Sequence, residues 1–198
     1  MLEVSHAVDV LNCGEIVAFP TETVYGLGAN AYDDAAVSKI FQYKDRPSAK
    51  PLSICYSSFD MALDDVELDD RALVLAEKFL PGPLTIVLKR RSSSRLSGLC
   101  SAGLKTIGVR VPAHPVALKL LSRLSFPLAA PSANKSGYAS PTTAEQVLEN
   151  FKDILVLNGG ECSIGIASTI VDLCNNKILR TGAININEIN GILDDGIQ

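Results

Sequence analysis

Three cationic side chains lie close together in one short stretch of the chain, at Lys44, Arg46 and Lys50. Two prolines fall in the same stretch, and each proline fixes its own φ and restricts the residue before it. Segment 44–52 therefore cannot continue a preceding helix, and we expect a shaped loop that holds its charges in a fixed array. Arginine offers a planar fork of donors and lysine a compact point charge, which together suit a polyphosphate. A solvated basic turn is the simpler alternative for this segment taken alone.

Further hydroxyl, amide and cationic side chains fall at the ends of expected strands or in the loops beside them. They are Thr21, Thr23, Arg110, Ser132, Asn134, Ser168, Thr169 and Arg180. In open α/β sheets, ligands bind beyond strand ends, where several loops converge. A structural role explains each of these residues singly, but their convergence predicts a site for an anion the size of a nucleotide.

Several standard catalytic motifs are absent from the sequence, among them GxxxxGK[ST] and GxSxG. Neither His6 nor His114 has an obvious serine or cysteine partner, so we expect both to pack or to cap a helix. Tyr25 is open to two interpretations, stacking on a base or filling a core or turn. The remaining hydroxyls, amides and cations suit phosphoryl or nucleotidyl transfer, because positioning and charge stabilisation supply most of the rate in that chemistry.

The elements that must position these residues alternate between strand and helix signals. Helices are expected at 3–12, 33–44, 70–80, 114–124 and 142–151. Strands are expected at 15–19, 52–56, 84–88, 106–111, 127–130, 154–157 and 168–173, with a last one around 178–179. Asp33 or Asp34 would cap the second helix, and Thr142 with Glu145 has the spacing of a capping box. This alternation favours an α/β layer fold with some antiparallel pairing.

Three segments are expected to lie outside the regular elements. Residues 20–28 form a polar stretch that ends in glycines and predicts a turn. Residues 60–70 carry six acidic side chains, which are most simply a solvated surface. The serine-rich stretch 91–103 is expected to be a mobile loop.

Composition limits the class of protein. The 198 residues are 47% hydrophobic and 20% charged, which is ordinary for a globular protein, and a chain of this length can bury about 70% of its unfolded surface. One domain spanning 1–198 is therefore expected. The net charge of -4 argues against coating nucleic acid through a general basic field.

The sequence also predicts where the protein works. It shows neither a secretory signal nor a stretch near the roughly 20 apolar residues of a membrane span. Its five cysteines are widely spaced, no CxxC occurs, and neither a zinc site nor a disulfide framework is legible. We expect a cytoplasmic protein with reduced thiols.

Six motifs in order resemble the YrdC-type threonylcarbamoyl-AMP synthases. They are PTETVYGLGANA (20–31), KDRPSAKPL (44–52), PGPLT (81–85), TIGVRVP (106–112), APSANKSG (130–137) and STIVDL (168–173). The match covers nearly the whole chain. The resemblance implies a twisted, mixed, open α/β sheet with flanking helices and a large, positively charged cavity. It also implies that L-threonine, bicarbonate and ATP give threonylcarbamoyl-AMP, pyrophosphate and water.

The resemblance assigns roles residue by residue. Lys44, Arg46 and Lys50 would serve catalysis. The ATP site would contain Arg46, Lys50, Thr106, Ser132, Asn134 and Arg180. The threonine site would contain Thr23, Arg110 and Ser168, with Arg110 pairing with the carboxylate. No metal ligands are legible, and Mg²⁺ would be held mainly through the phosphates. A threonine carbamate is itself the nucleophile at the α-phosphate, so the protein need not provide one.

The product would supply the threonylcarbamoyl group for adenosine 37 of tRNAs that read ANN codons, through a separate transferase. Weak or no direct binding of tRNA and no membrane partner are expected. The sequence departs from the family pattern at Cys55, where many members carry histidine, and at segments 165–167 and 180–182. The chain resembles the short form of the family, without the extra C-terminal domain of longer relatives.

Two alternatives stay open, one within the same superfamily and one from another class of function. A paralogue could keep the cavity and have lost or changed the activity, although the intact cationic loop and the Ser132/Asn134 pair argue against it. An RNA-binding module could use the same basic cavity, although the net charge of -4 and the lack of an aromatic and basic stacking surface argue against that. A carbamoyltransferase of hydrogenase maturation would be expected inside a much longer chain.

Overall fold

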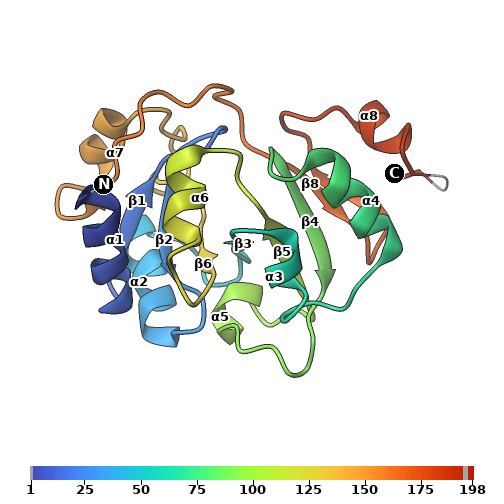
Figure 1. The fold of residues 1–198 in the computed structure, drawn as a ribbon, viewed down its shortest axis with the longest axis horizontal. Coiled ribbons are helices and arrows are strands. Elements are labelled where there is room, and N and C mark those ends of the chain that lie inside the picture. The colour runs from blue at the N-terminus through green and yellow to red at the C-terminus, as the bar shows by residue number, and fades with distance from the viewer. Residues whose placement is uncertain (1, 194–195) are drawn as a thin grey trace.

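The computed structural model describes residues 2–193 and 196–198. Its strands are β1 (Val17–Phe19), β2 (Gly26–Asn30), β3 (Ser53–Cys55), β4 (Leu84–Lys89), β5 (Thr106–Arg110), β6 (Leu128–Ala129), β7 (Leu155–Val156), β8 (Thr169–Asp172) and β9 (Lys177–Arg180). Within the described residues these nine strands form one sheet in the order β7-β1-β2-β6-β3-β5-β4-β8-β9 (Figure 1). The pairs β1/β7, β3/β5 and β4/β8 are parallel and the remaining neighbours antiparallel. The expected mixed, open α/β sheet is confirmed.

The helices lie where local signals place them, with three short additions. They are α1 (Leu2–Asn12), α2 (Asp34–Lys44), α3 (Phe59–Ala62), α4 (Asp70–Phe79), α5 (Gly98–Ser101), α6 (Pro115–Leu121), α7 (Ala144–Asn150) and α8 (Ile186–Asn190), and the additions are α3, α5 and α8. Asp33 caps α2 by accepting from the backbone N–H groups of the first turn, as expected. His114 caps α6 in the same way, which settles its role as a capping residue. Within the described residues, no helix is both long and apolar enough to cross a membrane.

Alternation along the strands separates two faces of the sheet. Along β5, Ile107 and Val109 belong to the larger apolar cluster, against which α2, α4 and α5 pack. Thr106, Gly108 and Arg110 alternate with them and therefore point to the opposite face. On that face α1 and α6 lie side by side and cover β1, β2 and β6 (Figure 1). The open part of this face, over β3 and β5, is where polar side chains gather.

The structure corrects the expectation of a turn over residues 20–28, because residues 26–28 belong to β2. The strand reads Gly-Leu-Gly-Ala-Asn, so it lacks the alternating large side chains that mark a strand in a sequence. A Cβ added at Gly28 would lie 2.9 Å from the ring of Phe19 and 3.1 Å from Leu128. Glycine is needed here because large side chains of the neighbouring strands cross its surface.

The acidic segment 60–70 is not wholly a solvated surface. Part of it forms α3, and Asp65 is 1% exposed. Its carboxylate accepts hydrogen bonds from Tyr32 (3.1 Å), Tyr56 (2.9 Å) and Ser94 (2.7 Å). A buried carboxylate must be satisfied by such donors, and these come from three other segments that local charge patterning does not reveal.

Two further expectations are corrected. The stretch 91–103 contains α5 and packs into the larger apolar cluster through Leu96 and Cys100, so it is not a loose loop. Backbone hydrogen bonds tie it to the neighbouring segments at both ends of this packed region. Helix α7 is capped by Thr143 rather than Thr142, which instead donates to the side chain of Gln146.

Candidate active site

A small basic pocket lies on the open part of the sheet, on the face that α1 and α6 cover elsewhere. Its volume is about 80 Å³, and its polar lining comes from five segments of the chain. These lining residues are Ser53, Arg110, Ser132, Ser140, Ser168 and Arg180. Its charge agrees with the basic cavity that the resemblance implied, but it is smaller than expected. The side chains of Arg110 and Arg180 occupy part of the space, because each is hydrogen-bonded to a neighbour in or beside the pocket.

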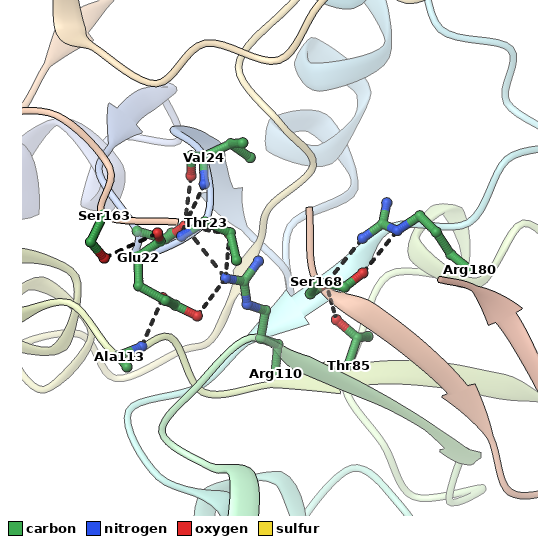
Figure 2. Close-up of polar contacts among 10 residues, drawn as sticks. Glu22, Thr23, Val24, Thr85, Arg110, Ala113, Ser163, Ser168 and Arg180 are labelled. Atoms are coloured by element: carbon green, nitrogen blue, oxygen red, sulfur yellow. Dashed lines mark hydrogen bonds and ion pairs between the residues drawn. The ribbon is translucent and has the colours of Figure 1, made fainter. Parts of the chain in front are cut away.

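Arg110 ends β5 and enters the pocket with only 8% of its surface exposed. Its Nη2 donates to Glu22 Oε1 at 2.8 Å, to Thr23 Oγ1 at 2.6 Å and to Thr21 Oγ1 at 3.4 Å (Figure 2). Its Nε is buried and has no hydrogen-bond partner among the described residues. Native proteins rarely leave such a donor unpaired, so this atom is suited to an anionic ligand.

Ser168 and Arg180 form the second side of the pocket, facing Arg110 (Figure 2). The hydroxyl of Ser168 bonds to Thr85 Oγ1 at 2.8 Å, and Arg180 donates to the carbonyl and the hydroxyl of Ser168 at 2.9 and 3.0 Å. Desolvation and the nearby positive charge of Arg110 lower the pKa of Arg180. Two cations that line one pocket favour an anion between them.

The turn at 132–136 contributes amide and hydroxyl groups. The side-chain amide of Asn134 donates to the carbonyls of Lys135 and Tyr138, which closes the turn. Asn134 Oδ1 and Ser136 Oγ are buried without a partner among the described residues. Together with Arg110 Nε, they are the buried side-chain polar atoms that protein groups leave unsatisfied in the described part of the chain. Ser132 of this turn lines the pocket, whereas Asn134 and Ser136 do not. Buried polar atoms without a partner are rare, so these two are suited to a ligand.

Lys44 is placed differently from its expected role beside the phosphates. Its side chain is 1% exposed, and its Nζ donates to the carbonyls of Ser132 and Asn134. Burial, together with the charge of Arg46, lowers the pKa of Lys44 to about 8. The structure thus places the ammonium group behind the turn, where it holds the turn in shape.

Arg46 and Lys50 lie on the outer side of the basic loop. Arg46 donates to the backbone carbonyls of Lys50 and Pro51, at 3.4 and 2.9 Å, and Lys50 is exposed. Neither forms an ion pair with a carboxylate among the described residues. Both cations are therefore available to an anionic ligand.

Thr23 and Thr106 also lie away from the pocket lining, as do Asn134 and the three cations of the basic loop. The hydroxyl of Thr23 is buried behind Arg110 and is engaged with it. Thr106 shares a strand face with Arg110, but four residues at about 3.3 Å each place it roughly 13 Å away. The parallel register pairs Ser53 with Gly108, so Thr106 stands beside the residues at which the basic loop enters β3.

Sequence reasoning missed the role of Glu22, which appeared there only within the run at 20–31. Its carboxylate is 6% exposed in the Arg110 pair and also accepts from the backbone N–H of Ala113 at 2.9 Å. An acidic residue between two threonines next to a strand was the available signal. Tyr25 is a core residue, since it is fully buried and its hydroxyl donates to the carbonyl of Gly160 at 2.8 Å.

The residues around the pocket do not suit a metal ion held by the protein. Within the described residues, no three histidine, cysteine, aspartate or glutamate side chains gather in one place. Glu22, the carboxylate nearest to Arg110 in the hydrogen-bond network, is already engaged through both of its oxygens. Cys55, which pairs with Arg110 across the parallel strands, is buried, and burial raises the pKa of its thiol to about 11.

These features define a class of protein: an α/β protein with a basic pocket on the open face of a mixed sheet. The Sua5/YciO/YrdC family model, described as telomere recombination, matches residues 9–182. The chain belongs to this family.

Known proteins agree with this assignment. The chain is 46% identical over 187 residues to the threonylcarbamoyl-AMP synthase of Pyrococcus abyssi, covering 92% of this chain and 54% of that protein. It is 39% identical over 197 residues to the threonylcarbamoyl-AMP synthase of Bacillus subtilis, covering 96% and 56%. The crystal structure of P. abyssi Sua5 complexed with L-threonine superposes with a TM-score of 0.93 at 42% identity, covering 98% of this chain and 58% of that one. The chain thus spans a little over half the length of these relatives.

Proposed function

We propose that this chain forms threonylcarbamoyl-AMP and pyrophosphate from L-threonine, bicarbonate and ATP. The observation that carries the proposal is the buried, unpartnered Nε of Arg110 in a pocket that it shares with Arg180 and Ser168. A guanidinium with a free donor pairs well with a carboxylate. The relatives named threonylcarbamoyl-AMP synthase, and the Sua5 structure with L-threonine, support the same substrate.

L-Threonine binds with its carboxylate at Arg110 in this proposal. Glu22 and Thr23 hold the guanidinium from behind, and Ser168 contributes a hydroxyl that Thr85 and Arg180 keep oriented. This end of the site therefore binds an amino acid through groups that are already hydrogen-bonded in place. Preorganised donors of this kind lower the cost of ordering the site around its ligand.

ATP occupies the remainder of the site. Arg46 and Lys50 bind its phosphates, and Ser132, Asn134 and Arg180 contact phosphate or ribose. Asn134 Oδ1 and Ser136 Oγ, which lack partners among the described residues, are suited to ribose hydroxyls. Thr106 lies at the far end of the same face. Lys44 keeps the turn at 132–136 in shape by holding two of its carbonyls.

The chemistry needs no nucleophile from the protein. The amine of threonine and bicarbonate give a carbamate and water. A carbamate oxygen then attacks the α-phosphorus of ATP, the new O–P bond forms, and the bond to the β-phosphate oxygen breaks, releasing pyrophosphate. The cations stabilise the charge that develops on the phosphates, and fixed positions for both substrates supply much of the rate.

The wider role follows from the product. Threonylcarbamoyl-AMP supplies the group that a separate transferase attaches to adenosine 37 of tRNAs reading ANN codons, in the cytoplasm and without tight tRNA binding by this chain. Mg²⁺ accompanies ATP through its phosphate oxygens, since the described side chains offer it no site of their own. No step in the proposal passes through a metal held by the protein.

Pyrophosphate release tests the proposal directly. The chain is incubated with ATP and Mg²⁺, with and without L-threonine and bicarbonate, and L-serine replaces L-threonine as the control. We expect release that requires L-threonine and bicarbonate together. ATP binding without threonine-dependent release would indicate a paralogue with another substrate. Failure to bind ATP at all would rule out the nucleotide site, and RNA binding lost with added salt would then favour the RNA module.

A further inference from the structure

Glu22 connects its own segment to two others, 110–113 and 163–164. Its Oε1 accepts from Arg110 at the end of β5, and its Oε2 accepts from the backbone N–H of Ala113 before α6. Its backbone carbonyl accepts from the N–H of Ile164 at 2.9 Å and from the hydroxyl of Ser163 at 3.4 Å. Figure 2 shows the contacts with Arg110, Ala113 and Ser163 meeting at Glu22. The position of the Arg110 guanidinium therefore depends on Glu22.

Glu22 also changes the charge of the pocket. Arg110 and Arg180 bring two positive charges to it, and the Glu22 carboxylate, 2.8 Å from Arg110, cancels one of them. Arg46 and Lys50, by contrast, form no ion pair among the described residues. The charge left near Arg110 matches a single carboxylate, whereas the charge of the basic loop remains available to phosphates.

We infer that Glu22 sets the anion preference of this pocket. It holds Arg110 by one amino group and cancels a unit charge, so that the pocket takes one carboxylate in preference to a phosphate. The inference rests on the proposed function, because the carboxylate is that of L-threonine. Such a residue would keep ATP and pyrophosphate from occupying the amino acid end of the site.

Direct titration of two probes tests the inference. L-Threonine and inorganic phosphate are each titrated by calorimetry into the wild-type chain and into Glu22→Gln, at fixed pH and ionic strength. Phosphate that binds at the basic loop contributes equally to both proteins, so the difference reports the pocket. Removing a unit charge beside Arg110 should make phosphate bind at least about tenfold more tightly.

A matched control separates local charge from net charge. Glu15 is 57% exposed and forms an ion pair with Lys39 at 2.7 Å, away from the pocket. Glu15→Gln removes the same charge and should leave phosphate affinity unchanged. A gain that is equal in both variants, or absent from Glu22→Gln, would overturn the inference.

Glu22→Asp separates charge from reach. It keeps the carboxylate but shortens the side chain by one methylene, so it cannot reach both Arg110 and Ala113. We expect L-threonine to bind at least about fivefold more weakly. Phosphate affinity should stay within about twofold of the wild-type value, because the negative charge beside Arg110 remains. If Glu22→Gln does not fold, this variant decides, because phosphate affinity that rises as threonine affinity falls would contradict the inference.

Failure of the proposed function would look different. A wild-type chain that binds no L-threonine would remove the substrate, but tighter phosphate binding by Glu22→Gln would still uphold the charge effect of Glu22. L-Threonine binding by the wild type with unchanged phosphate affinity in Glu22→Gln would leave the function standing and reject the inference.

Discussion

The basic loop that carries Arg46 and Lys50 and the pocket around Arg110 hold positive charge in different ways. Arg46 bonds only to backbone carbonyls, and Lys50 is exposed. Arg110 is buried and ion-paired, and its guanidinium is fixed by side chains from a neighbouring segment. The cations of the loop can adjust to a ligand that carries several charges. The fixed guanidinium of the pocket can pair with one small anion in one orientation. Equal residue types can therefore serve different ligands according to how they are held.

Arg110→Ala should have the largest effect, because it breaks a buried ion pair. Glu22 would lose its charged partner, which costs about 3–5 kcal/mol of folding free energy, and L-threonine binding should be lost with it. Chemical denaturation and calorimetry measure the two effects. Arg123→Ala removes an exposed arginine and should change stability by less than about 0.5 kcal/mol. If the two variants were equally stable, the buried Arg110–Glu22 ion pair would contribute no more to folding than an exposed arginine does.

Gly182→Ala tests how the packing of the backbone supports the pocket around Arg110. A Cβ at Gly182 would lie 2.3 Å from the carbonyl oxygen of Ala167 and 2.5 Å from the carbonyl carbon of Ser168. The segment that carries Ser168 must move, at a cost near the upper end of the 1–3 kcal/mol typical of overpacking.

Melting curves and L-threonine titration follow the effect of Gly182→Ala, and both stability and affinity should fall. Gly98→Ala is the control, because nothing lies within 4 Å of the added methyl group. Unchanged threonine affinity in Gly182→Ala would show that the pocket does not depend on this packing.

Arg46→Ala tests the role of the basic loop. Its guanidinium makes only two hydrogen bonds to backbone carbonyls, so folding stability should hardly change. A charge-assisted hydrogen bond to phosphate is worth about 1.5–3 kcal/mol, so ATP affinity should fall about ten- to hundredfold while L-threonine affinity stays the same. We measure both affinities by titrating ATP and L-threonine into this variant and into Lys152→Ala, which removes an exposed lysine as the control. Near-normal ATP affinity would contradict the assignment of Arg46.

Lys44 gives the smallest expected effect, a dependence of stability on pH. Its pKa in the folded chain is about 8, below its ordinary value of 10.5, so the unfolded chain retains a proton that the folded chain releases. The free energy of unfolding should therefore rise above pH 8, by about 1 kcal/mol per pH unit, relative to Lys44→Met. Urea unfolding at pH 7.5, 8.5 and 9.5 measures this difference. If the free energy of unfolding depended on pH in the same way in both proteins, the lowered pKa of the buried Lys44 would be contradicted.

Local signals predicted the elements that have local causes. Helix α2 begins at a capping aspartate, and the apolar strand at 84–88 agrees with β4. Strand β2 was missed because its small residues carry no alternation, although packing against Phe19 and Leu128 requires them to be small. Asp65 was assigned to the surface because its hydroxyl partners come from other segments.

The candidate site was predictable to a similar degree. The sequence placed Arg110, Ser168 and Arg180 at strand ends, and the structure brings them into one pocket. It gave no means of seeing that Lys44 lies behind the 132–136 turn, since 88 residues separate it from Ser132. Thr106 was grouped with the site by its motif, but the length of β5 separates it from Arg110.

The sequence by itself determined which chemistry is available to this protein. Prolines beside cations define the basic loop, and polar residues at strand ends predict a site for an anion. Only the tertiary structure decided which of the cations stay free. Glu22 neutralises Arg110 although 88 residues separate them, because the fold brings the segment after β1 against the end of β5. Charge pairing of this kind depends on distances in the folded chain, and local sequence patterns contain no information about them.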